Sequence, residues 1–167
     1  MISYLIGFAG FLVTGMLQLS VVSQIKILSG SADILLLYLI VWCMYDRSKH
    51  LWLMVFVMAG LVSSVSALPA VILMVVYFFV FGVTRMFQKR LMQSPLLGVI
   101  VITFVASLLQ IVLNMAYLFI SGVEFNLNTA LTEVALPSLI LNMFLAIPMH
   151  AIIREIAHYA FPKGLEA

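Results

Sequence analysis

The sequence predicts an all-α integral membrane protein of six transmembrane helices that form a compact bundle, and three observations lead to this fold class. First, 65% of the 167 residues are hydrophobic and only 8% are charged, whereas about a quarter of the residues of a soluble domain are charged. Second, long stretches contain no Asp, Glu, Lys or Arg, which is typical of helices that lie in hydrocarbon. Third, the basic residues cluster in short segments that follow these stretches, as in loops on one side of a membrane.

The charge-free stretches give the positions of the spans. A helix needs about 20 residues to cross the hydrocarbon core, so the 35 residues from His50 to Thr84 are too many for one crossing. Pro69 divides this stretch, because proline disfavours helix at the preceding residue and suits the first turn of a new helix. We expect a tight turn at Ser66–Leu68. The single domain, 1–167, then has spans at about 3–22, 33–45, 51–66, 69–84, 96–120 and 134–153.

The basic residues predict the orientation of these spans. Lys and Arg in short loops mark the cytoplasmic side of a membrane. With six spans, seven of the eight basic residues fall on one side, and only Lys26 falls on the other. The N- and C-termini are therefore expected in the cytoplasm. Within this side, the segment 85–93 mixes basic and apolar residues, which favours a short helix on the inner membrane surface.

Polar residues inside the spans recur at steps of three or four, which places them on one face of a helix. The clearest stripe consists of Thr103, Ser107, Gln110, Asn114, Tyr117 and Ser121. Shorter stripes of small and polar residues contain Gly7, Gly10, Thr14 and Gln18; Ala59, Ser63 and Ala67; and Ser138, Asn142, Ala146 and His150. Interhelical hydrogen bonds and small residues hold helices together in lipid. We therefore expect the four spans with stripes to form the inner bundle, with 33–45 and 69–84 on its lipid-facing side.

Two interpretations of the stripes stay open. The polar side chains are either contacts between packed helices, or they line a small-ligand pocket or a groove for a partner's helix. The stripes contain no Asp, Glu, Lys or Arg, which argues against an ion-driven carrier. Asp33 is expected to cap the helix that follows it. Trp42, Tyr45 and Trp52 are expected to be anchors at the membrane interface, and His150 is expected to cap carbonyls or contact headgroups.

No motif with a catalytic mechanism is present. The sequence has no nucleophile elbow, P-loop or dinucleotide-binding fingerprint, and Cys43 is the only cysteine. The His residues have no Cys or carboxylate neighbours at the spacing of metal ligands. We therefore expect neither an enzyme nor a cofactor or metal site. The net charge of +2 arises from the loops and gives no indication of nucleic acid.

The order of several short segments resembles the MreD family of bacterial rod shape-determining membrane proteins over almost the whole chain. The segments are Leu17-Gln18 with Ser20, Asp33-Ile34-Leu35-Leu36, and a final pattern formed by Pro137, Ser138, Asn142, Pro148 and Arg154. The resemblance implies a non-enzymatic subunit of the cell-elongation complex in the plasma (inner) membrane of a bacterium. Its implied partners are MreC, the lipid bilayer and, through the complex, RodA, a class B penicillin-binding protein and MreB.

The resemblance also implies a fold similar to that of the six-helix substrate-binding subunits of energy-coupling-factor transporters. The alternative function is therefore that of a substrate-binding membrane subunit of a vitamin or small-molecule transporter. The candidate residues for helix packing or partner binding are Gln18, Asp33, Ser63, Gln110, Asn114, Asn142 and Pro148.

Overall fold

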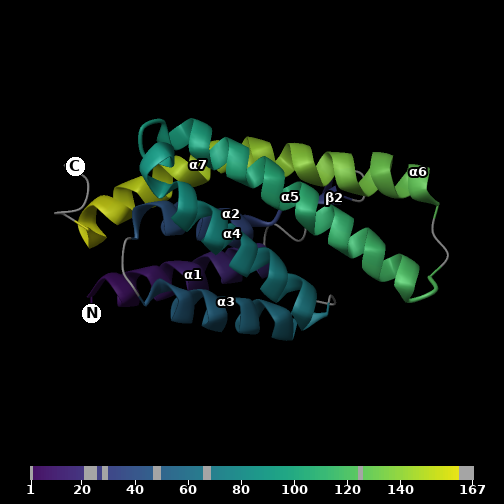
Figure 1. Cartoon of the computed structure of the whole chain (residues 1–167), viewed down its shortest axis with the longest axis horizontal. Helices are drawn as coiled ribbons and strands as arrows, with labels where there is room; N and C mark the ends of the chain where they lie inside the picture. Colours follow the sequence, from purple (N-terminus) through teal and green to yellow (C-terminus); the bar gives the residue numbers. More distant parts are fainter. Residues whose placement is uncertain are drawn as a thin grey trace.

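The computed structural model describes residues 2–20, 26–27, 30–46, 50–65, 69–123 and 126–161, and these residues are mostly helical (Figure 1). Two short antiparallel strands precede the second helix. In chain order, the elements are α1 (Ile2–Ser20), β1 (Lys26–Ile27), β2 (Gly30–Ser31), α2 (Ile34–Tyr45), α3 (Leu51–Val65), α4 (Ala70–Leu91), α5 (Pro95–Ile120), α6 (Leu127–Thr129), the π-helical segment η2 (Ala130–Ala135) and α7 (Leu136–Ala160).

Each of the six spans expected from the sequence coincides with a helix, but two connecting segments differ from expectation. The separate surface helix expected at 85–93 is wrong, because α4 continues without a break to Leu91. Residues 85–91 are mostly good helix formers, and the next proline is Pro95. The segment 121–133 between the last two expected spans, where a loop would be expected, is partly helical, since α6 and η2 begin within it. The expected turn at Ser66–Leu68 lies outside the described residues.

In the part of the chain that the structure describes, three helical stretches are long and apolar enough to cross a membrane: α4, α5 and the continuous segment Leu127–Ala160. Their 22, 26 and 34 residues correspond to about 33, 39 and 51 Å of α-helix, compared with about 30 Å of hydrocarbon. The chain therefore has the features of a membrane protein. α2 is much shorter, because its 12 residues extend over only about 18 Å.

α2 lies at the centre of the bundle rather than on its lipid-facing side. All of its residues are buried, and it packs against α1, α4, α5 and α7. The expectation that 33–45 faces lipid is therefore wrong. A helix that is hydrophobic all round is suited to complete burial, and α2 has no polar stripe because packed apolar side chains surround it on every side. The expected outer position of α4 is also wrong in part, since the face with Val76, Tyr77 and Val80 is buried.

Two glycines of α1 accommodate the largest side chains of α2. A Cβ atom at Gly7 would lie 2.6 Å from Trp42 Cζ2, and a Cβ atom at Gly10 would lie 2.6 Å from Tyr38 Oη. Tyr38 Oη donates a hydrogen bond of 2.6 Å to the carbonyl oxygen of Gly7. The stripe of small residues in α1 is thus the surface on which the aromatic residues of α2 pack.

Two of the three aromatic residues expected at the membrane interface lie in the core instead. Trp42 is fully buried, and its ring stacks on that of Tyr38 with centroids 5.9 Å apart. Tyr45 is also buried and stacks on His150 at 6.2 Å, so His150 packs against a ring rather than against headgroups. Only Trp52 is exposed, at 47%. The position of an aromatic residue near the end of a span did not distinguish an anchor from a core residue.

The C-terminal end of α2 is held by α4. Gln88 Nε2 donates a hydrogen bond of 3.0 Å to the carbonyl oxygen of Met44, and Arg85 Nη1 donates one of 3.3 Å to that of Asp46. The last carbonyls of a helix have no partner within the helix, and a positive charge is favourable there. The extension of α4 beyond Thr84 therefore provides partners for the buried end of its neighbour.

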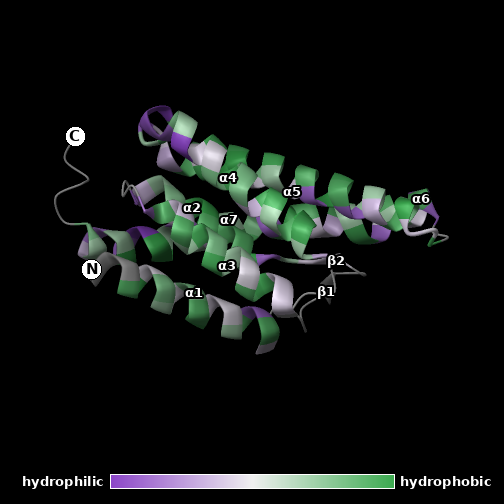
Figure 2. Cartoon of the chain, turned by 60° about the horizontal axis from the view of Figure 1, so that its bottom comes forward, coloured by the Kyte–Doolittle hydropathy of each residue, from purple (hydrophilic) through white to green (hydrophobic). Residues whose placement is uncertain are grey.

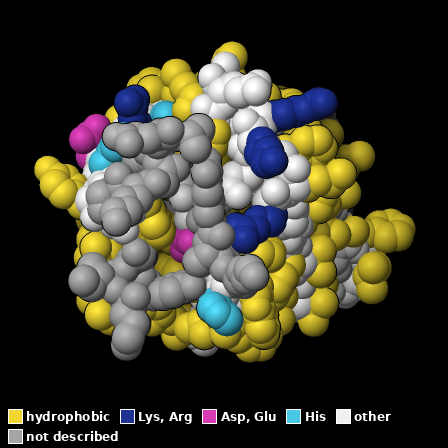
Figure 3. Space-filling model, turned by 60° about the vertical axis from the view of Figure 1, so that its left-hand side comes forward, with side chains coloured by type: hydrophobic (Ala, Val, Ile, Leu, Met, Phe, Trp, Pro, Cys, Tyr) yellow, Lys and Arg dark blue, Asp and Glu magenta, His cyan; other side chains and the backbone are white. Residues whose placement is uncertain are grey.

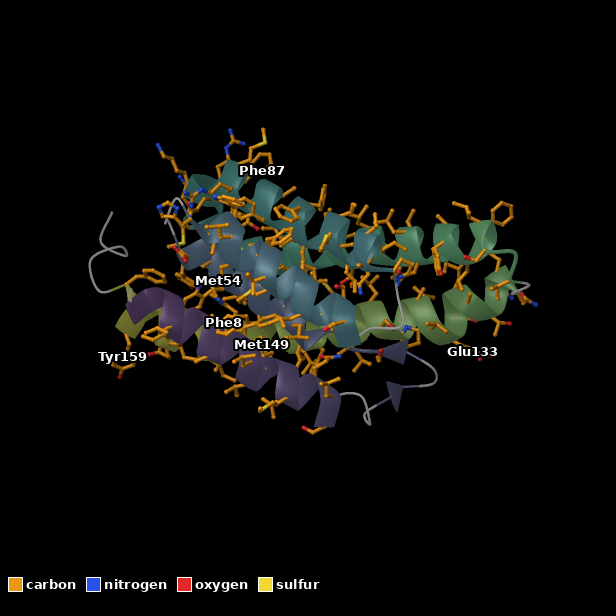
Figure 4. All side chains as sticks on the ribbon, turned by 90° about the horizontal axis from the view of Figure 1, so that it is seen from below. Phe8, Met54, Phe87, Glu133, Met149 and Tyr159 are labelled. Atoms are coloured by element: carbon orange, nitrogen blue, oxygen red, sulfur yellow. The ribbon has the colours of Figure 1, made fainter. Side chains whose placement is uncertain are left out.

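The bundle has two chemically different ends. α1 begins and α7 ends at the same end of the molecule (Figure 1), and the Lys and Arg side chains in Figure 3 gather there among His and apolar side chains. Hydrophobic residues cover most of the helices, and several hydrophilic residues lie together near the end of α4 (Figure 2). Phe87 and Tyr159 lie at this end, whereas Glu133 lies at the opposite one (Figure 4).

Candidate functional site

The N-terminal end of α2 lies inside the bundle, where side chains from three elements bind its backbone amides. Asp33 Oδ1 accepts a hydrogen bond of 3.0 Å from the amide of Leu36, as a helix cap does. Gln18 Oε1 of α1 accepts one of 2.9 Å from the amide of Ile34. Asn142 Oδ1 of α7 accepts one of 2.8 Å from the amide of Asp33. These bonds satisfy donors that have no partner within the helix.

The other ends of the same side chains connect the surrounding helices. Gln110 Nε2 of α5 donates to Asp33 Oδ2 over 3.1 Å, and Asn142 Nδ2 donates to Ser107 Oγ over 3.0 Å. Gln18 Nε2 donates to the carbonyl oxygen of Ala32 over 2.8 Å.

Ser138 Oγ of α7 completes the set by accepting a bond of 3.1 Å from the amide of Ser31. The segment Ser31–Ile34 is thereby bonded to α1, α5 and α7. We call the side chains that make these bonds the polar cluster: Gln18, Asp33, Ser107, Gln110, Ser138 and Asn142.

The electrostatics of the polar cluster are dominated by one carboxylate. Asp33 lies at the positive end of the α2 dipole and receives one hydrogen bond on each carboxylate oxygen. Its carboxyl group thus has hydrogen-bond partners inside an apolar bundle, where a polar group without partners would be unfavourable.

A cavity of about 670 Å³ adjoins the polar cluster and is partly open to the surroundings. All six cluster side chains contribute to its wall. The rest of the wall is mainly apolar and includes Phe11 and Met16 of α1, Leu61 of α3, Ile111 and Met115 of α5, and Val134 of η2. A wall of apolar side chains with a few convergent polar groups is typical of small-molecule sites, and the volume lies within their usual range.

Asn114 also lines this cavity, one helical turn beyond Gln110. Its Oδ1 atom is buried and has no hydrogen-bond partner among the described residues. A buried polar atom without a partner is unfavourable by about 1–3 kcal/mol. Asn114 therefore contributes an unused acceptor to the cavity.

The structure brings four of the seven candidate residues to the start of α2. Asp33 is hydrogen-bonded to Gln110 and to Asn142, and Gln18 binds the backbone of Ala32 and Ile34. Asn114 lines the same cavity. The other two lie elsewhere. Ser63 Oγ donates to the carbonyl oxygen of Gly60 in its own helix, over 2.7 Å. Pro148 is an exposed residue within α7.

Two members of the polar cluster are absent from the candidates, although both belong to the stripes seen in the sequence. Ser107 and Ser138 are serines at regular helical positions, and serine in a membrane helix is more often a small packing residue. The signal that could have found them is their spacing of one turn from Gln110 and Asn142. Their backbone and side-chain partners on other elements have no signature in the sequence.

Within the described ranges, no group of three or more His, Cys, Asp or Glu side chains is placed to hold a metal ion. Comparisons with models of protein families, with curated proteins and with solved structures find no match to this chain. The arrangement itself can do two things: it joins α1, α5 and α7 to the buried end of α2, and it presents acceptor atoms to a cavity.

Proposed function

We propose that the chain is a non-enzymatic membrane subunit of the bacterial cell-elongation (rod) complex, which supports cell shape and peptidoglycan synthesis by binding MreC. The resemblance of the sequence to the MreD family motivates this proposal. One structural observation carries it further. Gln18, Asp33, Ser138 and Asn142 belong to the segments on which the resemblance rests, and they all bind within the short stretch around Ser31–Ile34. Segments that are remote in sequence thus serve one structural unit, as is expected of a fold-defining pattern.

The proposed membrane arrangement has six spans and both termini in the cytoplasm. The main helices alternate in direction along the bundle (Figure 1), which supports successive crossings. The short α2 is compatible with this arrangement, because it is surrounded by protein and its ends are bonded by other helices. The last turns of α4, which contain Arg85, Lys89 and Arg90, lie at the end where α1 begins (Figure 1), which supports a cytoplasmic location for that end.

The exposed surface of the helices supports a role in assembly within the bilayer. Large apolar side chains point outward from α1, α5 and α7, including Leu5, Phe119 and Phe144, which are 69%, 79% and 72% exposed. Such faces contact lipid or the helices of other membrane proteins. In our proposal, MreC binds such a face directly, and RodA, the class B penicillin-binding protein and MreB are reached through the complex.

Affinity purification from bacterial membranes in a mild detergent tests this function. We expect MreC to be the main protein that co-purifies with the tagged chain. The matched control is a tagged six-helix membrane protein of another function, produced at the same level and purified in the same detergent. A monodisperse and folded preparation that recovers no more MreC than this control contradicts the proposal.

The cavity specifically favours a second function, that of a substrate-binding subunit of a vitamin transporter. Its volume of about 670 Å³ and its polar cluster suit a small molecule. A thermal-shift screen against vitamins separates the two functions. A vitamin that stabilises the purified protein at sub-micromolar concentration favours the transporter, whereas recovery of MreC without any such vitamin favours the rod complex.

A further inference from the structure

We propose that the cavity binds an amphipathic small molecule whose buried polar end donates hydrogen bonds and carries no negative charge. The molecule places this end against Asp33 and Asn114, and its apolar body lies between α1, α3 and α5. This inference concerns the cavity alone and holds whichever partner protein the chain binds.

The acceptors in the cavity wall define the polar end of the ligand. Asn114 Oδ1 has no hydrogen-bond partner in the described part of the chain. Asp33 Oδ2 accepts one hydrogen bond, from Gln110, and a carboxylate oxygen has room for a second. Asn114 Oδ1 and Asp33 Oδ2 can therefore each accept a further hydrogen bond. The polar end of the ligand must supply the donor, such as a hydroxyl or an ammonium group.

The charges of the wall exclude an anionic end. Among the described residues that line the cavity, Asp33 is the only ionisable one, and none is Lys, Arg or His. A phosphate or carboxylate placed there would lose its hydration without gaining a counter-charge, and it would lie beside another carboxylate. The buried end of the ligand is therefore neutral or cationic, which excludes phosphorylated compounds bound by their phosphate.

The remaining wall selects an apolar body. Phe11, Leu12 and Met16 of α1 face the same cavity as Ile111, Met115 and Leu118 of α5. α1 packs mainly on α2, so this space between α1 and α5 is not filled by direct packing of the two helices. An aliphatic chain there would gain about 25 cal/mol for each Å² of apolar surface removed from water.

A matched series of photoreactive probes tests the chemistry of the polar end. The probes are decanol, decylamine and decanoate that each carry a diazirine on the chain, and the protein is used whole in phosphatidylcholine nanodiscs. We expect the alcohol and the amine to label cavity-lining peptides of α1 and α5, and the carboxylate to label them about tenfold less. Equal labelling by all three headgroups overturns the proposal.

Two cavity-filling variants test the location. Gly15 lines the cavity, and a Cβ atom there meets only Leu35 Cδ2, at 3.7 Å, so Gly15→Leu has room to enter the space. Ser64→Leu fills it from α3. We expect each of these two variants to lose most of the labelling by the alcohol and the amine, provided that it unfolds at the same temperature as the wild type. The control is Val112→Ala, at a site on α5 that is 60% exposed, and it should keep the labelling. Labelling that persists in a folded, filled variant contradicts the site.

Asn114→Leu tests the acceptor itself. We expect it to weaken labelling by the alcohol and the amine by about tenfold, which corresponds to about 1.4 kcal/mol, and to leave the weak labelling by the carboxylate unchanged. An unchanged affinity for the alcohol and the amine would show that Asn114 does not bind the polar end.

The source of the natural ligand is decided by native mass spectrometry of the protein released from its own membranes. A retained neutral or cationic lipid identifies the bilayer as the source. Probe binding without a retained lipid identifies a molecule taken from solution. A retained anionic lipid that Gly15→Leu displaces contradicts the proposal.

Discussion

Gln110 Nε2 donates a hydrogen bond of 3.1 Å to Asp33 Oδ2, although 77 residues separate the two in sequence. The bond joins the middle of α5 to the cap of the buried helix α2. Asp33 is bonded at the same time to the amide of Leu36 and, through its own amide, to Asn142. A Gln inside a charge-free stretch of 33 residues (91–123) thus has a defined structural partner.

Replacing Gln110 by Leu should destabilise the bundle, because among the described residues Gln110 is the donor that the side chain of Asp33 receives from another helix. We expect the free energy of unfolding to fall by about 0.6–2 kcal/mol, the range of interhelical hydrogen bonds in membranes. The measurement is reversible unfolding in mixed micelles. Asn114→Leu is the matched control, since Asn114 Oδ1 bonds to none of the described residues. If both variants lose the same stability, the Gln110–Asp33 bond is not what stabilises this region.

Asn142→Leu should destabilise the protein more than Gln110→Leu. Asn142 joins the amide of Asp33 to Ser107 Oγ, so the substitution breaks two hydrogen bonds. Each buried group left without a partner is unfavourable by about 1–3 kcal/mol. Unfolding measured side by side with Phe144→Leu, at an exposed position on the same helix, checks this. A smaller effect for Asn142→Leu than for Gln110→Leu would contradict the two-bond assignment.

Two glycine substitutions should act in opposite directions. In Gly10→Ala, the new Cβ atom would meet Tyr38 Oη at 2.6 Å, so α1 must move away from α2 and stability should fall. In Gly60→Ala, nothing lies within 4 Å of the new atom, and the higher helix propensity of alanine favours folding by up to about 1 kcal/mol. Thermal unfolding of the two variants in one detergent decides the matter. Equal melting temperatures would mean that α1 does not pack on α2 through Gly10.

An aspartate should be far less tolerated at Ile40 than at Ser63. Ile40 is fully buried in the central helix, and a charge without a partner is very unfavourable there. Ser63 is only half-buried, in α3. We expect Ile40→Asp to prevent accumulation of folded protein, whereas Ser63→Asp accumulates near the wild-type level. Fluorescence-detected size-exclusion chromatography of detergent extracts provides the comparison, and similar peaks for the two variants would overturn the central position of α2.

Local patterns in the sequence predicted the helices and the faces that turn inward. Charge-free length and Pro69 located the six helices to within a few residues, except that α4 continues to Leu91 and α7 continues to Ala160. The steps of three and four residues correctly placed Thr103, Ser107, Asn142 and Ala146 on buried faces. The lower part of the α5 stripe was wrong, because Tyr117 and Ser121 are exposed. These features depend on helical periodicity, which is a property of neighbouring residues.

The position of each helix relative to the others could not be predicted in the same way. An apolar helix without a stripe is equally compatible with lipid and with a protein core, so α2 was expected outside and lies at the centre. Trp42 was expected at the interface because it lies near the end of a span, but a buried helix also ends near such residues, and Trp42 lies in the core. The polar cluster was also only partly visible, since Gln18 and Asn142 bind backbone amides, which every residue except proline carries.

The distance in sequence between Asp33 and Asn142 sets an order of assembly. The ribosome makes Asn142 109 residues after Asp33, so the Asp33 amide has no side-chain acceptor from α7 while α1 to α5 are being made. α2 also measures only about 18 Å, too little to be retained in the membrane without its neighbours. The contacts that bury α2 are therefore complete only after α7 has been translated, and a nascent chain that stops before α7 leaves that amide without its partner.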